Sequence, residues 1–230
     1  MLNPFFPDDS RGKQIVIFAF PLVFYTLFFN IIPTGLNEAI TQYSVRIFYA
    51  TLIFCTYYTL ILGLMSFFLY WQNSSAFFKV NLKGNDVLCV ILLVLANLFL
   101  STIFTFYLPL PLNQELLNEN QMMVSKDVLL VRFYWGGIVT LINEELFYRG
   151  ILMSTYFKHS RYYLDVLVSA ICFASAHVIW SAWSWLDFIQ YIPAGLSLGL
   201  TFKWTKSIYY PILLHFLVNY GPRIVDILLN

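Results

Sequence analysis

The chain has 230 residues, of which 60% are hydrophobic and only 11% are charged. Soluble domains contain about 45–50% apolar and about 25% charged residues, so the composition excludes a soluble globular protein and indicates a polytopic membrane protein. The net charge of +1 gives no reason to expect nucleic acid as a partner. The three cysteines, Cys55, Cys89 and Cys172, lie singly in apolar runs and form neither a disulfide framework nor a metal motif.

Apolar runs of membrane-spanning length follow one another along the chain. They cover residues 14–33, 47–71, 87–110, 129–153, 164–182, 187–203 and 207–227. The first run is too long for a signal peptide and lacks its small-residue cleavage site. A polar linker, 111–127, separates the N-terminal helices of region 1–110 from the C-terminal helices of region 128–227. We therefore predict an all-α transmembrane bundle of about seven helices, with a C-terminal four-helix core as its catalytic part.

Loop charges give this bundle an orientation. In the predicted topology, one side of the membrane receives Arg11, Lys13, Lys79, Lys83, Lys158, Arg161, Lys203 and Lys206. The opposite side receives Glu38, Glu115, Glu119 and Asp187, and its few bases lie near helix ends: Arg46, Lys126, Arg132 and Arg223. Cytoplasmic loops are enriched in lysine and arginine. The sequence therefore predicts a multi-pass protein with a cytoplasmic N-terminus, in the plasma membrane of a bacterium.

Three charged residues lie within one predicted membrane helix: Glu144, Glu145 and Arg149. Each would cost at least about 2.5–3.5 kcal/mol near the centre of a bilayer, so they need partners or a function. Glu145 and Arg149 are four residues apart, on one helical face, and are expected to pair. Glu144 points about 100° away around the helix and is expected to remain without a cation of its own. Desolvation would make its carboxylate more basic and suit it to general base catalysis.

Two later apolar runs each hold one histidine and a residue four positions from it. Phe173 precedes His177, and Asn219 follows His215. Counted at about 1.5 Å per residue, these groups reach depths similar to that of Glu144. Taken singly, each has a structural explanation: a buried histidine bonded within the core, an ion-pair clamp at Glu145, or an asparagine that bridges helices. Their coincidence at one depth favours a hydrolytic site.

Three motifs occur in a fixed order: Glu-Glu-x-x-x-Arg at 144–149, Phe-x-x-x-His at 173–177 and His-x-x-x-Asn at 215–219. Over roughly residues 128–225 the chain thereby resembles the CPBP intramembrane proteases. These form the CAAX-protease and bacteriocin-processing family, also called Abi, whose eukaryotic members are type II CAAX prenyl endopeptidases. The small-residue stretch with Gly195 and Gly199 is also similar to a helix of that family, and these glycines would let helices pack closely.

The resemblance implies an intramembrane endopeptidase. Glu144 and His177 would activate a water, and His215 and Asn219 would donate to the developing oxyanion. Glu145, Arg149 and Phe173 would support the site. Its expected partners are the lipid bilayer and a membrane-associated peptide or protein: a CAAX-type tail, a peptide leader or a bacteriocin-like precursor. Substrate entry is expected near the loop of Lys158, Arg161, Lys203 and Lys206, and the loop histidine His159 is expected to be dispensable.

The residues also allow a zinc enzyme, a transporter or a scaffold. Zn²⁺ could be held by Glu144, His177 and His215, since two histidines and a carboxylate form a known catalytic zinc site, and the family is often labelled metalloprotease. We favour no metal and no cofactor, because Asn219 is a poor zinc ligand and the sequence lacks a compact His-Glu-x-x-His motif. Intramembrane carboxylates and histidines could instead relay ions or protons in a transporter. A non-catalytic immunity or scaffold protein could use the same polar groups to hold its helices together.

Overall fold

The computed structural model describes residues 11–42, 46–72, 78–79, 84–112, 115, 137–157, 162–179 and 183–229. All regular secondary structure in these ranges is helical. The chain forms two compact units. Unit 1 combines residues 1–74 with 124–159, and unit 2 combines 75–123 with 160–230.

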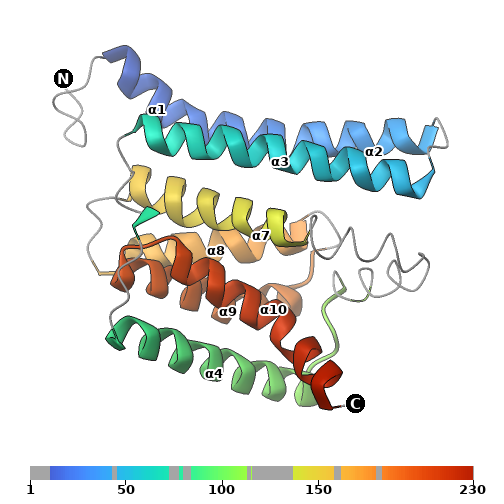
Figure 1. Cartoon of the computed structure of the whole chain (residues 1–230), viewed down its shortest axis with the longest axis vertical. Coiled ribbons are helices and arrows are strands. Elements are labelled where there is room, and N and C mark those ends of the chain that lie inside the picture. The colour runs from blue at the N-terminus through green and yellow to red at the C-terminus, as the bar shows by residue number, and fades with distance from the viewer. Residues whose placement is uncertain are drawn as a thin grey trace. The chain divides into compact units, whose positions relative to one another are not determined.

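Unit 1 contains two long helical rods and one shorter helix in its described part. Its elements are α1 (Arg11–Phe24), the π-helix η1 (Tyr25–Ile31), α2 (Ile32–Gln42), α3 (Ile47–Trp71), α7 (Ile138–Glu145) and the π-helix η4 (Leu146–Tyr156). Figure 1 shows α3 alongside the continuous rod of α1, η1 and α2. The rings of Phe20 and Phe68 stack there with centroids 3.7 Å apart. The amide of Asn143 ties α7 to α3, because its Nδ2 donates to the Tyr58 carbonyl over 2.8 Å.

Unit 2 is built around one helix that packs against three others. Its elements are α4 (Gly84–Tyr107), α8 (Leu164–Ile179), α9 (Trp185–Thr205) and α10 (Tyr209–Leu229). The central helix is α9, which contacts α4, α8 and α10. It begins at Ser184, whose hydroxyl accepts from the Asp187 backbone N–H, and it ends at Lys206 in a left-handed conformation. Asn97 of α4 donates to Ser197 of α9 over 2.6 Å, a buried polar tie between two apolar helices.

Two glycines let α9 approach α8 very closely. A Cβ added at Gly195 would lie 2.8 Å from the Ala170 Cα and 3.0 Å from the Ala170 carbonyl oxygen. A Cβ added at Gly199 would lie 3.0 Å from Val166 Cγ1. Only a residue without a side chain fits against backbone at the first distance. The close packing expected of these glycines is thus confirmed.

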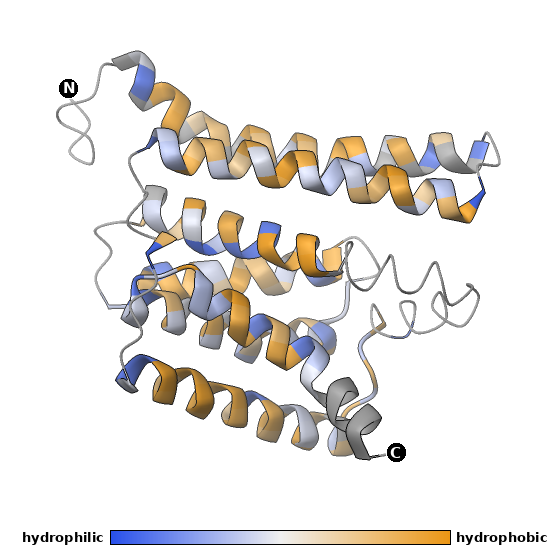
Figure 2. Cartoon of the chain, in the orientation of Figure 1, coloured by the Kyte–Doolittle hydropathy of each residue, from blue (hydrophilic) through white to orange (hydrophobic). Residues whose placement is uncertain are grey.

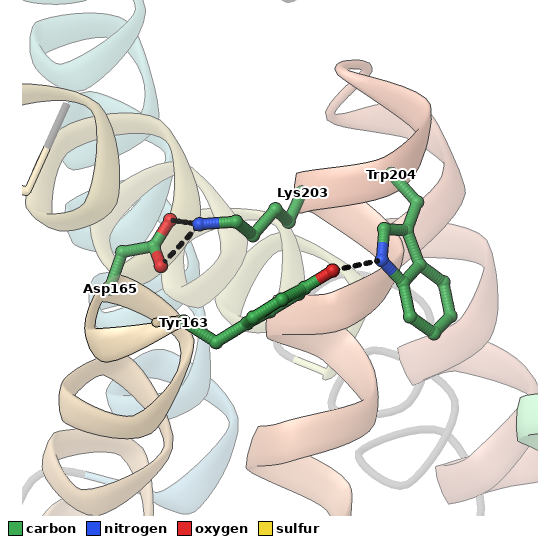
Figure 3. A network of polar contacts seen from close by, with 4 residues as sticks. All are labelled: Tyr163, Asp165, Lys203 and Trp204. Atoms are coloured by element: carbon green, nitrogen blue, oxygen red, sulfur yellow. Dashed lines mark hydrogen bonds and ion pairs between the residues drawn. The ribbon is translucent and has the colours of Figure 1, made fainter. Parts of the chain in front are cut away.

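An ion pair closes one end of this helix pair (Figure 3). Lys203 Nζ lies 2.6 and 2.7 Å from the two carboxylate oxygens of Asp165. The same ammonium lies 4.8 Å from the ring centroid of Tyr163, and the Trp204 indole N–H donates to the Tyr163 hydroxyl over 3.4 Å. The pair crosses from α8 to α9 and therefore contributes to fixing how far each helix slides along the other.

The helices match the predicted apolar runs, and two of them have the composition of membrane spans. Among the described residues, α3 and the stretch Gly84–Phe104 are long and apolar enough to cross a bilayer, and α8 is a shorter apolar helix. Figure 2 shows α4 hydrophobic along most of its length, with hydrophilic residues at its N-terminal end. Seven spans, a four-helix core and a sequence division at 111–127 stay predictions. The two compact units divide the chain differently, since α4 packs with α9 and α10, and α7 packs with α3.

Replacing Gly195 with alanine should destabilise the protein by about 1–3 kcal/mol, the usual cost of overpacking. Gly199→Ala should cost less, because Val166 can move its side chain where the Ala170 backbone cannot yield. Gly63→Ala in α3 is the control, since its added Cβ would meet nothing within 4 Å. Unfolding of the purified proteins in one detergent measures all three. Equal stability of the Gly195→Ala and Gly63→Ala variants would contradict the close packing.

Candidate active site

A buried ion pair lies at the end of α7 in unit 1. Arg149 Nη1 donates to Glu145 Oε1 over 2.8 Å, and both side chains are 0% exposed. The pairing expected from the spacing of four residues is confirmed. Since neither charge reaches solvent, each depends on the other and on its protein surroundings to offset its desolvation.

Glu144 is more accessible than its neighbour but is not electrostatically isolated. Its side chain is half-buried, and its charge acts on both Arg149 and Tyr58. Arg149 forms its ion pair with Glu145, and the expectation that Glu144 has no cation of its own stays a prediction. The backbone changes from α to π after Glu145. The assumption of uniform α-helical geometry from 144 to 149 does not hold there.

The imidazole of His177 in unit 2 is fixed in one tautomer. Its Nδ1 lies 2.8 Å from the Phe173 carbonyl oxygen, one turn earlier in α8. A carbonyl can only accept a hydrogen bond, so Nδ1 carries the proton. In the neutral ring Nε2 then holds the lone pair. This nitrogen can accept a proton from water or bind a cation.

Aromatic rings surround this histidine. The Phe173 ring lies 4.5 Å from the His177 ring and 5.5 Å from the His215 ring, centroid to centroid. Phe173 thus contacts two imidazoles that come from α8 and α10. On α9, the Tyr191 ring lies 4.5 Å from that of His177, with an interplanar angle of 32°. Sequence reasoning did not single out Tyr191, because it belongs to none of the three motifs.

The third pair differs in exposure along α10. His215 is 4% exposed, whereas Asn219, one turn further, is exposed. The two are four residues apart in one α-helix, as the sequence predicts. His215 is the buried member that touches the Phe173 ring.

The predicted site residues are therefore divided between the units. Glu144, Glu145 and Arg149 belong to unit 1, and the others to unit 2. Within the part of the chain that the structure describes, no three His, Cys, Asp or Glu side chains are close enough together to hold a metal ion. His159, Lys158 and Arg161 lie outside the described residues.

A comparison with protein-family models gives a match to the C-terminal part of the chain. Residues 126–221 match the model of the type II CAAX prenyl endopeptidase Rce1-like proteins. This part of the chain is similar to the Rce1-like family. The match contains all three motifs and confirms the resemblance read from them. No curated protein and no solved structure gives a significant match. Rce1-like proteins are membrane-embedded proteases, so the Rce1-like segment indicates a hydrolase that acts on peptide bonds.

In the Rce1-like segment, Glu145→Ala should destabilise the protein by about 3–5 kcal/mol, because it leaves Arg149 buried without its bonded carboxylate. Glu144→Gln keeps shape and should stay near the wild-type stability. Denaturation of the purified variants in one detergent measures both effects.

A double variant provides the control for this prediction. Replacing Glu145 with leucine and Arg149 with methionine removes both charges together, and should be more stable than Glu145→Ala. If Glu145→Ala and Glu144→Gln lost equal stability, the structural role of the buried pair would be contradicted.

Proposed function

We propose that the protein is an intramembrane endopeptidase that hydrolyses a peptide bond in a membrane-associated peptide or protein. The observation that carries this proposal is the fixed tautomer of His177, whose Nε2 is prepared to take a proton. That histidine stands in the second motif of the segment that matches a protease family. Two further observations support it: a half-buried glutamate in the first motif, and a histidine and asparagine in the third.

In the proposed mechanism, Glu144 and His177 together activate one water. Glu144 orients the water and draws on its proton, and His177 Nε2 serves as the second acceptor. The oxygen attacks the substrate carbonyl carbon and forms a tetrahedral intermediate. The proton then passes to the leaving amine as the C–N bond breaks.

The negative oxygen of this intermediate requires hydrogen-bond donors. We assign that role to the His215 imidazole and the Asn219 side-chain amide. Donors of this kind contribute about 2.7–4 kcal/mol each in comparable sites, because they strengthen as charge develops. The exposure of Asn219 suits a group that must meet a substrate. The Glu145–Arg149 pair would hold the helix end that carries Glu144.

We infer the position of unit 2 in the membrane from the two ends of α9. Trp185 and Trp204 are 68% and 49% exposed. They are nineteen residues apart in α9, about 28 Å at the helical rise, which is close to the thickness of the hydrocarbon core. Tryptophan is enriched at membrane interfaces, and lysine on the cytoplasmic side. Lys203 and Lys206 therefore support a cytoplasmic location for that end of α9. We propose a multi-pass protein with a cytoplasmic N-terminus in a bacterial plasma membrane.

The proposed substrates share one property: the scissile bond is held at the membrane. A CAAX-type tail, a peptide leader and a bacteriocin-like precursor all have it. His177 lies twelve residues beyond Asp165 in α8, about 18 Å along the helix from the ion pair at the Lys203 end. The chemistry would thus take place within the bilayer, away from bulk water.

Glu144→Gln tests the proposal, because the amide keeps the shape of the carboxylate but cannot accept the proton of water. Membrane peptidomes of cells that produce wild-type protein or this variant should differ in a defined set of cleavage products, which the variant fails to make. His159→Gln is the control and should cleave like the wild type. Identical peptidomes for wild type and Glu144→Gln, at equal expression, would reject the enzyme.

A zinc-dependent form of the same protease is the alternative mechanism. Glu144, His177 and His215 would hold the ion, and the acceptor state of His177 Nε2 also fits a metal ligand. Bound zinc would lower the pKa of a coordinated water and so supply the nucleophile. We favour the metal-free form, because Asn219 suits an oxyanion donor better than a ligand.

Prolonged dialysis against a strong zinc chelator should therefore leave peptidase activity intact. Metal analysis of the same sample should find well below one zinc per chain, since the Glu144 and His177 pair already supplies the base. Loss of activity that zinc alone restores, with stoichiometric binding, would establish the metal-dependent form. An apo-protein with full activity would establish the metal-free one.

A further inference from the structure

One aromatic residue outside the three motifs contacts the proposed base. Among the residues that the structure describes, the His177 imidazole has two ring neighbours, Phe173 and Tyr191, each 4.5 Å away between centroids. Phe173 is part of the second motif and comes from the same helix. Tyr191 comes from α9, so the contact depends on how α8 and α9 pack. We call Phe173, His177 and Tyr191 the aromatic clamp.

The antiparallel register of the two helices places Tyr191 at the clamp. Gly195, one turn after Tyr191, fits against Ala170 in α8. The Asp165–Lys203 pair closes the far end of the same interface. Tyr191 is twelve residues before Lys203, and His177 is twelve residues after Asp165. The ion pair and the ring contact are therefore set by the same alignment of α8 against α9.

The hydrogen bond and the ring contacts of His177 restrict different motions of the imidazole. The hydrogen bond from Nδ1 to the Phe173 carbonyl fixes the tautomer, but a single bond at one edge leaves the ring plane free to tilt. Terminal torsions of histidine are broad and have little preference of their own. Two neighbouring rings restrict that tilt. Aromatic faces also attract a cation, so the same rings stabilise the imidazolium that forms when Nε2 takes a proton.

We infer that Tyr191 is a positioning residue of the peptidase, which holds the His177 ring so that Nε2 stays directed at the catalytic water. The inference rests on the proposed function for its effect on turnover, but the effect on the ring itself does not depend on it. The aromatic ring of Tyr191, and not its hydroxyl, makes the contact that holds the His177 ring. Phenylalanine at this position should therefore replace tyrosine, whereas leucine should not.

Kinetics of three variants test the effect on turnover. The probe is an internally quenched farnesylated peptide that ends in a CAAX sequence, in detergent micelles of one composition. Tyr191→Leu should lower kcat by about threefold to tenfold, as expected for the loss of one aromatic pair, with KM within about twofold of wild type. Tyr191→Phe should stay near wild type. Phe202→Leu is the control, because it removes a buried ring of α9 near the opposite end of the helix.

Nitrogen NMR tests the ring without any need for turnover. The chain has three histidines, so protein labelled with ¹⁵N-histidine gives three imidazole spin systems, and His159→Gln and His177→Asn assign them. Wild type and Tyr191→Phe should show one neutral His177 tautomer with the proton on Nδ1. Tyr191→Leu should keep the proton on Nδ1, where the Phe173 carbonyl holds it, but should show exchange broadening at His177 alone, because the ring can tilt more freely.

The two readouts separate the possible outcomes. Unchanged His177 signals in Tyr191→Leu would overturn the inference, and so would a Tyr191→Phe variant as impaired as Tyr191→Leu, which would assign the effect to the hydroxyl. If no variant, including wild type, cleaved the probe, the proposed function would fail for this substrate. The NMR result would still decide whether Tyr191 holds the ring.

Discussion

The geometry of unit 2 depends on the close approach of α8 and α9 at two glycines. Where Gly195 lies against the backbone of Ala170, the helices are as near as backbones allow, and shape complementarity rather than hydrophobic transfer holds them together in lipid. This contact fixes rotation as well as distance. The Asp165–Lys203 pair at one end and the ring contact of Tyr191 with His177 at the other are both consequences of that one packing arrangement.

Buried polar side chains are satisfied in different ways in the two units. In unit 1, two opposite charges neutralise each other directly, at 2.8 Å and with no solvent exposure. In unit 2, a backbone carbonyl and aromatic faces satisfy the imidazole of His177. Hydrogen-bond and ring contacts of this kind satisfy a polar side chain without a second buried charge, which would be costly in a low-dielectric setting.

The sequence predicted the all-helical class correctly, because long apolar runs have few possible structures in a membrane. The run 47–71 coincides with α3, and the pairing of Glu145 with Arg149 followed from helical spacing. Spacing could not reveal the change from α to π after Glu145, since it presumes one helical pitch. Tyr191 was missed because its contact with His177 is set by the packing of two helices, and a single sequence contains no direct signal of helix–helix register.

The buried ion pair also bears on how the protein reaches its membrane. Glu145 and Arg149 are neighbours on one helical segment, so they can neutralise each other without any other helix. If these charges are already paired when the segment enters the bilayer, the lipid meets fewer unpaired charges than the sequence suggests. The free-energy cost of insertion depends strongly on such local pairing. If the arginine belonged to a distant helix, Glu145 would stay unpaired in the bilayer until the helices assembled. The pair can therefore form within its own helical segment, before other helices pack around it.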